Sequence, residues 1–287
     1  MIIVLKNADF SSDNIGQIEL PIEIRPEIES ILSNYTKSMT NSQRGAFQIF
    51  YDSISSILPK IKVLYIPLLA ENLGETTFNI ADSMSNVRLN ESVFKFKDGG
   101  IYSEVGTDVS SFTPATISTL SSVDGNNIHI IAAHSSYTET TKKVAFSFGN
   151  KTTTRIRFNE GPDNQYVKPI MESISEGCIN SKKIVSYQNY VDYDTCAMPI
   201  VNKAFGVSIL SGRLSSMIVL HKDTGATNID HDITITDELG TLGNCGIGDY
   251  DFSSNPVCFI SIGDGLTLDE MKLYESAINK LISAFVQ

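Results

Sequence analysis

The sequence predicts a mainly β fold, a β-sandwich of the jelly-roll type with a helical segment near the N-terminus and one helix near the C-terminus. Three observations predict it. After Pro59 the chain consists of short runs rich in Val, Ile, Thr, Phe and Tyr, which is the composition of β-strands. Turn-forming residues separate these runs, and no alternation of strands with helices indicates a parallel sheet. The chain then ends in a strand, a turn and a helix-like pattern.

Residues 1–22 predict an extended arm. Apolar side chains alternate with others around Ile2 and Val4, and again from Ile15 onward, with a turn-like polar stretch between them. The alternation ends at Pro21, and Pro26 follows shortly afterwards. Such a segment has the period of a strand but too few apolar residues for a core of its own.

Residues 23–58 predict a helical neck made of two helices. Apolar residues recur at helical spacing, with a break near Thr40 and Asn41. Two faces result, the first with Ile28, Ile31, Leu32 and Tyr35, the second with Phe47, Phe50, Tyr51, Ile54, Ile57 and Leu58. The first helix is too short for a coiled coil of its own, although it could dock on a neighbouring subunit.

Residues 59–287 predict the jelly-roll domain, closed by the C-terminal helix. The predicted strands are 93–96, 128–133, 144–148, 153–158, 183–187, 204–210, 216–221 and 232–236, and Gly, Asp and Asn residues in turn combinations lie between many of them. A last strand covers the apolar run 257–262. Gly263, Asp264 and Gly265 then break the run, and Thr267 with Glu270 has the spacing of a capping box at the start of a helix.

Composition excludes several classes of protein. The chain has 287 residues, and 22 Lys and Arg against 33 Asp and Glu give a net charge of −11 with no basic patch, so we expect no nucleic-acid partner. The longest apolar stretch, 61–70, is about half of the roughly 20 residues that a membrane-spanning helix needs, and we expect neither membrane insertion nor a signal peptide. The four cysteines, Cys178, Cys196, Cys245 and Cys258, are far apart, which favours reduced, buried thiols in a protein made in a cytoplasm.

Motifs for catalysis are missing, so we expect a protein that is not an enzyme and needs no cofactor. No Gly-x-Ser-x-Gly elbow and no Glu-x-Asp-x-Glu strand is present, and the glycines near Gly246 do not have the spacing of a nucleotide-binding loop. His129 and His134 lie in a predicted strand without a partner at a ligand spacing, which favours structural roles. His221 and His231 fall at a strand end and in a turn, where His231 between two aspartates could instead form a pH-sensitive contact.

Two loops contain residues that could bind a ligand. Tyr187, Tyr190 and Tyr193 are close together, and exposed tyrosines can stack on a sugar ring, although packing in a core or interface is the alternative. Asp249 and Asp251 form the second candidate. They and the pair Asp192 and Asp194 have the spacing of calcium ligands in loops, but neither pair matches a complete calcium loop, so we expect solvated turns and no metal.

Three segments together resemble a known family. They are residues 50–82, with a helix followed by Ile61-Lys-Val-Leu-Tyr-Ile-Pro and the turn Asn79-Ile-Ala-Asp; residues 205–225, with two strands joined by a turn of small residues and Arg213; and residues 245–285, with Gly246-Ile-Gly, an apolar strand, Ile262-Gly-Asp-Gly-Leu-Thr and an amphipathic helix. These segments are similar to phage and prophage fibre proteins, of the tail-fibre or head-fibre type, with a concanavalin-like jelly-roll domain. The opening Lys6-Asn-Ala-Asp-Phe-Ser-Ser-Asp-Asn-Ile-Gly resembles the N-terminal segment of related virion proteins from tailed phages of gut anaerobes.

The resemblance implies a virion protein without enzymatic activity that displays a lectin-like domain on the head or tail. Its partners would be capsid or tail proteins, other copies in a homo-oligomer, expected as a trimer, and glycans on a host surface or in the environment. The residues expected to anchor it to the particle are Ile2, Val4, Asn7, Asp9, Phe10 and Ile15. The alternative is a soluble carbohydrate-binding module or a glycan-active enzyme that uses the tyrosine and aspartate loops.

Overall fold

The computed structural model describes the chain in separate ranges. They are residues 23–82, 89, 91, 94–103, 115–116, 122–124, 127–135, 144–149, 154–160, 167–173, 182–186, 204–209, 217–221, 225–229, 241–243, 246–247 and 256–286. The predicted arm, 1–22, lies outside them.

The larger sheet has eight strands and is antiparallel in every pair. Its order is β13 (Gly225–Ile229), β12 (Met217–His221), β11 (Ala204–Ile209), β6 (Ile128–His134), β16 (Val257–Gly263), β3 (Gly100–Ser103) and β2 (Phe94–Lys97), and β1 (Ile61–Tyr65) also pairs with β16. The two central strands, β6 and β16, are buried along their whole length. Such strands read as continuous apolar runs in the sequence, which is why both were predictable.

A second sheet has six strands, in the order β10 (Lys182–Ser186), β9 (Val167–Ser173), β8 (Thr154–Glu160), β7 (Val144–Gly149), β15 (Gly246–Ile247) and β4 (Ala115–Thr116). A short pair joins β14 (Thr241–Gly243) to β5 (Ser122–Asp124). Cα atoms of β9 and β11 lie within 8 Å of each other, so the two larger sheets are neighbours. This architecture confirms the predicted fold class, a mainly β sandwich with helices in its N- and C-terminal regions.

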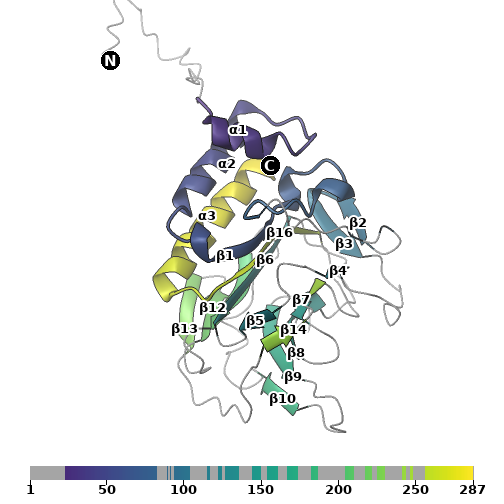
Figure 1. Cartoon of the computed structure of the whole chain (residues 1–287), viewed down its shortest axis with the longest axis vertical. Helices are drawn as coiled ribbons and strands as arrows, with labels where there is room; N and C mark the ends of the chain where they lie inside the picture. Colours follow the sequence, from purple (N-terminus) through teal and green to yellow (C-terminus); the bar gives the residue numbers. More distant parts are fainter. Residues whose placement is uncertain are drawn as a thin grey trace, which may run out of the picture.

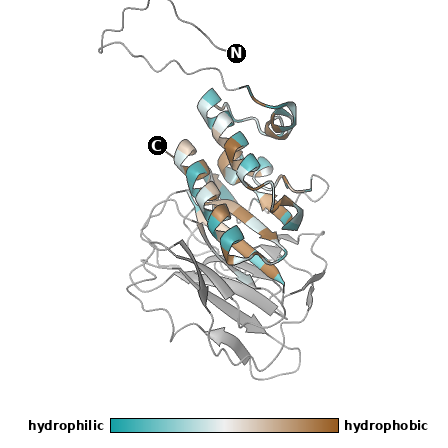
Figure 2. Cartoon of the chain, turned by 90° about the vertical axis from the view of Figure 1, so that its left-hand side faces the viewer, coloured by the Kyte–Doolittle hydropathy of each residue, from teal (hydrophilic) through white to brown (hydrophobic). Residues whose placement is uncertain are grey.

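Helices α2 (Asn41–Ser53) and α3 (Leu268–Phe285) lie over one face of the larger sheet, and α1 (Pro26–Leu32) lies at the end of this helical layer (Figures 1 and 2). Three short 3-10 turns are η1 (Leu58–Lys60), η2 (Pro67–Leu69) and η3 (Leu73–Glu75). A capping box begins α2 at Thr40 and Gln43, and another begins α3 at Thr267 and Glu270 as predicted. Each box satisfies backbone N–H groups that a helix otherwise leaves unpaired.

A hydrophobic core lies between the helices and the larger sheet. The ring of Phe50 from α2 packs edge-on to Phe259 of β16, with centroids 5.8 Å apart, and stacks on Tyr274 of α3 at 6.4 Å. All three rings are buried, and burying one such side chain contributes roughly 1.5–3 kcal/mol. The two predicted helices are therefore confirmed, with Ile28, Phe47 and Phe50 facing the core; the predicted boundaries between arm, neck and domain stay predictions.

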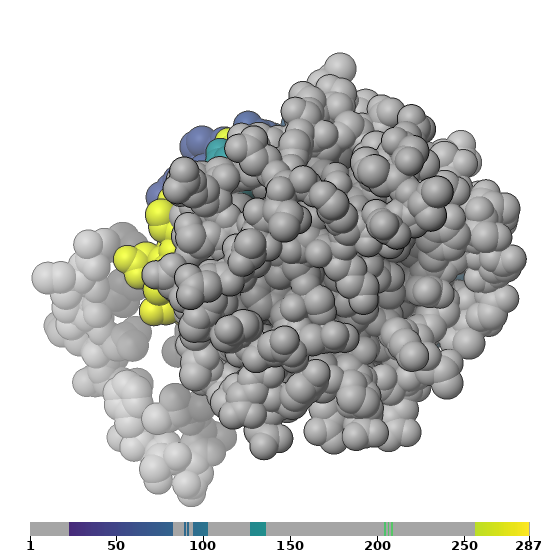
Figure 3. Space-filling model, turned by 90° about the horizontal axis from the view of Figure 1, so that it is seen from below, coloured from purple at the N-terminus to yellow at the C-terminus, as the bar shows by residue number. Residues whose placement is uncertain are grey.

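Most predicted strands agree with observed ones to within two residues. Eight observed strands were not among the strands predicted from periodicity: β1, β3 (Gly100–Ser103), β4, β5, β9, β13, β14 and β15. The predicted strand 232–236 lies outside the described residues. Seen from the end opposite to α1, the described residues that reach the surface lie together at one side of the molecule (Figure 3).

Candidate functional site

The ligand-binding residues predicted from the sequence lie outside the described residues, and so do the predicted anchoring residues. These are Tyr187, Tyr190, Tyr193, Asp249 and Asp251 for the ligand, and Ile2, Val4, Asn7, Asp9, Phe10 and Ile15 for the virion. Both sets stay predictions. The described part of the chain contains a different polar cluster, where β16 turns into α3.

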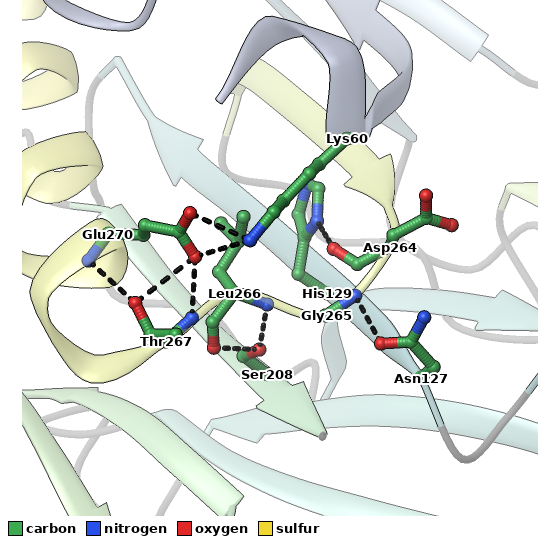
Figure 4. A network of polar contacts seen from close by, with 9 residues as sticks. All are labelled: Lys60, Asn127, His129, Ser208, Asp264, Gly265, Leu266, Thr267 and Glu270. Carbon is green, nitrogen blue, oxygen red and sulfur yellow. Dashed lines mark hydrogen bonds and ion pairs between the residues drawn. The ribbon is translucent and has the colours of Figure 1, made fainter. Parts of the chain in front are cut away.

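We call this cluster the α3 joint (Figure 4). Its residues come from four segments of the sequence that the fold brings together: Lys60, Asn127, His129, Ser208, Ser261, Asp264, Gly265, Leu266, Thr267, Glu270 and Tyr274. The joint connects the first turn of α3 to β6, β11 and η1.

His129 is at the centre of the joint and is completely buried. Its Nδ1 lies 2.6 Å from the backbone oxygen of Asp264, and its Nε2 lies 2.9 Å from Oγ of Ser261. A carbonyl oxygen can only accept, so Nδ1 carries the proton and donates it to Asp264. Nε2 of the neutral ring then accepts the hydroxyl proton of Ser261.

A buried tyrosine extends this chain of hydrogen bonds. The hydroxyl of Tyr274 in α3 donates to Oγ of Ser261 in β16 over 2.9 Å. Three hydrogen bonds therefore run in one direction, from Tyr274 to Ser261, from Ser261 to His129, and from His129 to Asp264. They connect the middle of α3 to two central strands, and burial makes each of them costly to break.

The close approach of β1, β16 and β6 at this point requires a glycine. Gly263 is paired with His129 across the sheet and with Ile61 of β1. A Cβ atom at Gly263 would lie 2.1 Å from the backbone oxygen of Lys60 and 2.8 Å from Cε1 of His129. No side chain fits there, so the register of the joint depends on this residue.

Two further side chains hold the turn between β16 and α3. Ser208 of β11 is buried, its hydroxyl donates to the backbone oxygen of Leu266 over 2.7 Å, and it accepts from the backbone N–H of Leu266 over 2.6 Å. Asn127 accepts from the backbone N–H of Gly265 over 3.1 Å. The turn thus pairs its main-chain groups with a side chain from β11 and with one from the residue that precedes β6.

Charged groups surround the buried part of the joint. Nζ of Lys60 lies 2.7 Å from both carboxylate oxygens of Glu270, and Nζ of Lys62 lies 3.2 Å from the carboxylate of Asp264. Partial burial alone would raise the pKa of Glu270, but hydrogen bonds from Lys60 and Thr267 outweigh it and hold that pKa below its ordinary value.

The joint is built for structure and not for reaction chemistry. Burial lowers the pKa of His129 from 6.5 to about 4, in spite of the opposing effect of the hydrogen bond to Asp264, so the ring is neutral at pH 7. A general base must reach a substrate proton, whereas both nitrogens of this buried ring are bonded within the protein. This agrees with the expectation of a structural histidine.

The other reactive groups among the described side chains are also enclosed. His134, at the end of β6, is buried, and burial lowers its pKa to about 3. Burial raises the pKa of the Cys258 thiol, which keeps it protonated and unreactive. Within the described ranges, no group of three or more His, Cys, Asp and Glu side chains is arranged to hold a metal ion.

No protein-family model matches the sequence, and no curated protein matches it either. Among solved structures, domain 4 of AbnA, an extracellular arabinanase from Geobacillus stearothermophilus solved with arabinotriose, is 12% identical with a TM-score of 0.43, over 75% of this chain and 98% of that one. The binding domain of Paraclostridial Mosquitocidal Protein 1 is 9% identical with a TM-score of 0.41, over 77% and 53%. A leech intramolecular trans-sialidase is 13% identical with a TM-score of 0.32, over 53% and 23%. No ligand or activity of this chain follows from likenesses at these TM-scores.

Sequence reasoning missed the joint as a unit. Thr267 and Glu270 were predicted as a capping box because that interaction is local. The partners His129, Ser261 and Tyr274 are separated by up to 145 residues (274 − 129) and become neighbours only through the pairing of β6 with β16. The available sign was a histidine and a serine inside two otherwise apolar runs, where a polar side chain needs a partner.

Proposed function

We propose that this chain is a structural protein of a phage particle, without enzymatic activity, that attaches through its N-terminal arm and displays the β-sandwich to bind glycans. The observation that carries the proposal is the separation of two ends of the molecule. The described chain begins beside α1, and β10 of the second sheet lies at the opposite end (Figure 1). A protein that is held at one end and presents loops at the other needs this arrangement.

The base of the arm is tied to the helical end. Arg25 forms ion pairs with Glu27 and Asp52, and its backbone N–H donates to Oε1 of Gln48 over 2.8 Å. Nε2 of Gln48 in turn donates to the backbone oxygen of Glu23 over 3.5 Å. Residues 23–25, where the described chain begins, therefore lie against α2. An extended arm at that place can add a strand to an edge on the particle, gaining main-chain hydrogen bonds without a core of its own.

We propose that the protein has no enzymatic activity, which a cleavage assay on capsular polysaccharide tests. The described histidine side chains are buried, and the described ranges contain no metal-binding cluster. None of the helices in these ranges combines the length and hydropathy that a membrane span requires.

Glycan binding would belong to the loops of the sandwich. Tyr187, Tyr190 and Tyr193 are the candidates for stacking on sugar rings, and Asp249 and Asp251 for hydrogen bonds to sugar hydroxyls. Several copies on one fibre, as in the expected trimer, would convert weak single contacts into firm attachment through avidity.

Deletion of residues 1–22 tests attachment. We expect the shortened chain to fold, with an unchanged thermal transition, and to be missing from purified particles. Incorporation of the shortened chain would contradict the anchoring role.

Glycan-array binding of the full chain tests display, with Tyr190→Ala and Asp249→Ala as variants and Tyr102→Ala, on β3, as the control. Loss of signal in the two loop variants alone is expected. Cleavage of a capsular polysaccharide by the unmodified chain would replace the proposal with the alternative of a glycan-active enzyme.

A further inference from the structure

The two ends of α3 are fixed by different chemistry. Near its N-terminal end, the contacts involve two groups that take up protons in acid, the imidazole of His129 and the carboxylate of Glu270 bound to Lys60. The ion pair of Asp264 with Lys62 lies beside them. These are the charged and titratable groups that face His129 from η1, β16 and α3, together with the hydroxyl of Tyr274.

Nearer the other end of α3, two contacts of the described residues involve no group that takes up a proton in acid. The ammonium of Lys37 donates to the backbone oxygen of Leu68 over 2.9 Å and lies 5.4 Å from the centroid of the Phe285 ring. The amide oxygen of Asn279 accepts from the backbone N–H of Ala204 over 3.2 Å. A lysine stays protonated as the pH falls, and an amide does not titrate.

The number of protons in this chain of hydrogen bonds explains why His129 makes the joint sensitive to acid. In the neutral state, three protons occupy three contacts: Tyr274 to Ser261, Ser261 to His129, and His129 to Asp264. A fourth proton, on Nε2, points at Oγ of Ser261, and the hydroxyl proton of Ser261 then loses its acceptor. The added charge is also buried and close to the ammonium of Lys60. Protonation therefore reverses the hydrogen bond between His129 and Ser261, leaves one buried donor without an acceptor and places a charge in the core.

We propose that acid opens the molecule at the α3 joint, so that α3 leaves the sheet from its N-terminal end while its C-terminal end stays docked. His129 is the group that senses the proton, and Glu270 strengthens the response at lower pH. This conformational device does not depend on the function proposed above.

The pH window follows from the two states of the ring. In the closed state, with α3 docked on the sheet, burial lowers the pKa of His129 to about 4. In the open state, with the N-terminal end of α3 detached, the pKa of the ring returns to its ordinary value of 6.5. The open state therefore binds the proton first as pH falls below 6.5, and the opening equilibrium rises about tenfold per pH unit until pH reaches about 4. Glu270, whose pKa is lowered in the closed state, adds to the effect below about pH 4.5.

Hydrogen exchange with mass spectrometry, corrected for the chemical rate at each pH, tests the proposal on the full chain. Between pH 6 and 4.5 we expect protection of residues 268–274 to fall about tenfold per pH unit, and protection of residues 279–285 to stay nearly constant. Equal loss at both ends of α3, or no loss at either, would overturn the proposal.

Variants identify the responsible group. His129→Gln should remove the pH dependence of hydrogen-exchange protection in residues 268–274 between pH 6 and 4.5. Glu270→Gln should leave the change in hydrogen-exchange protection between pH 6 and 4.5 as it is, and should weaken the loss of protection below pH 4.5. Asp269→Asn removes an exposed carboxylate in the same turn and should behave as the unmodified chain.

If His129→Gln does not fold, nitrogen NMR of the unmodified chain decides the question. A neutral His129 with its proton on Nδ1 down to pH 5 is expected. A ring that carries its proton on Nε2, or that titrates near pH 6.5, would overturn the proposal.

Discussion

The helices of this protein are held in two different ways. The α1–α2 pair is connected by ion pairs at the surface, between Arg25 and Asp52 and between Arg44 and Glu29, whose side chains are 32–51% exposed. At its centre, the α3 joint instead uses hydrogen bonds between fully buried side chains, including His129 and Ser261. The first set lies within the helical layer, and the second connects that layer to the sheet.

The surface ion pairs orient the chain, whereas the buried hydrogen bonds of the α3 joint fix the fold. A surface ion pair contributes about 0–1 kcal/mol because water and salt screen it. A buried hydrogen bond is worth little more when formed, but leaving one partner unpaired costs about 1–3 kcal/mol. Changes at the joint should therefore lower stability strongly, whereas changes at the surface pairs should alter only the base of the arm.

The largest effect is expected from Gly263→Ala. The added Cβ would lie 2.1 Å from the backbone oxygen of Lys60, and backbone cannot move aside as a flexible side chain can. We expect a loss of at least about 4 kcal/mol in the free energy of unfolding, measured in urea, or no folded protein. Gly74→Ala is the matched control, because its Cβ would meet only Oδ1 of Asn72, at 3.2 Å. Equal stabilities of the two variants would refute the packing described for the joint.

The next effect is the dependence of stability on pH. The pKa of His129 is lowered by burial in the folded state, so its contribution is complete above about pH 6.5 and is lost as pH falls toward 4. From pH 6.5 to 4.5 we expect His129 to remove about 2 to 3 kcal/mol from the free energy of unfolding. His134, with its pKa lowered to about 3, acts in the same direction. Urea titrations at several pH values measure how the free energy of unfolding changes with pH. A free energy of unfolding that does not change between pH 6.5 and 4.5 would contradict the burial of both rings.

A smaller effect is expected from Tyr274→Phe. This change removes one donor to Ser261 and leaves the ring in place, so it should cost about 1 kcal/mol. Tyr51→Phe, on α2, tests the comparison, since Tyr51 is only partly buried and should change stability by less than about 0.5 kcal/mol. Thermal unfolding followed by circular dichroism measures both changes. A larger loss of stability in Tyr51→Phe than in Tyr274→Phe would mean that contacts of the α1–α2 pair, and not those of the α3 joint, fix the fold.

The smallest effect is expected from Arg44→Gln. Loss of its ion pair with Glu29 should change the free energy of unfolding by about 0–1 kcal/mol, and the change should shrink further in high salt. Measurements at low and high ionic strength check this. A cost above about 2 kcal/mol that persists in high salt would mean that the surface pairs also fix the fold.

The sequence was a good guide where interactions are local and a poor one where they are not. The periods of α2 and α3, the capping box at Thr267 and the apolar run of β16 depend on neighbouring residues, and all were predicted. Strand β9 was missed because Pro169 and charged residues interrupt its pattern. The α3 joint was missed because Lys60, His129 and Tyr274 meet only through sheet pairing between distant segments.

The central claim is that this chain is part of a virus particle, attached at its helical end. Quantitative mass spectrometry of particles purified from the strain that encodes the chain tests it most directly, with the portal and major capsid proteins as internal standards. The account predicts a constant ratio, either a small multiple of the portal count for a collar or tail fibre, or a number that scales with the capsomers for a head fibre. Absence of the chain from purified particles would contradict the account and favour a soluble glycan-binding or glycan-active protein.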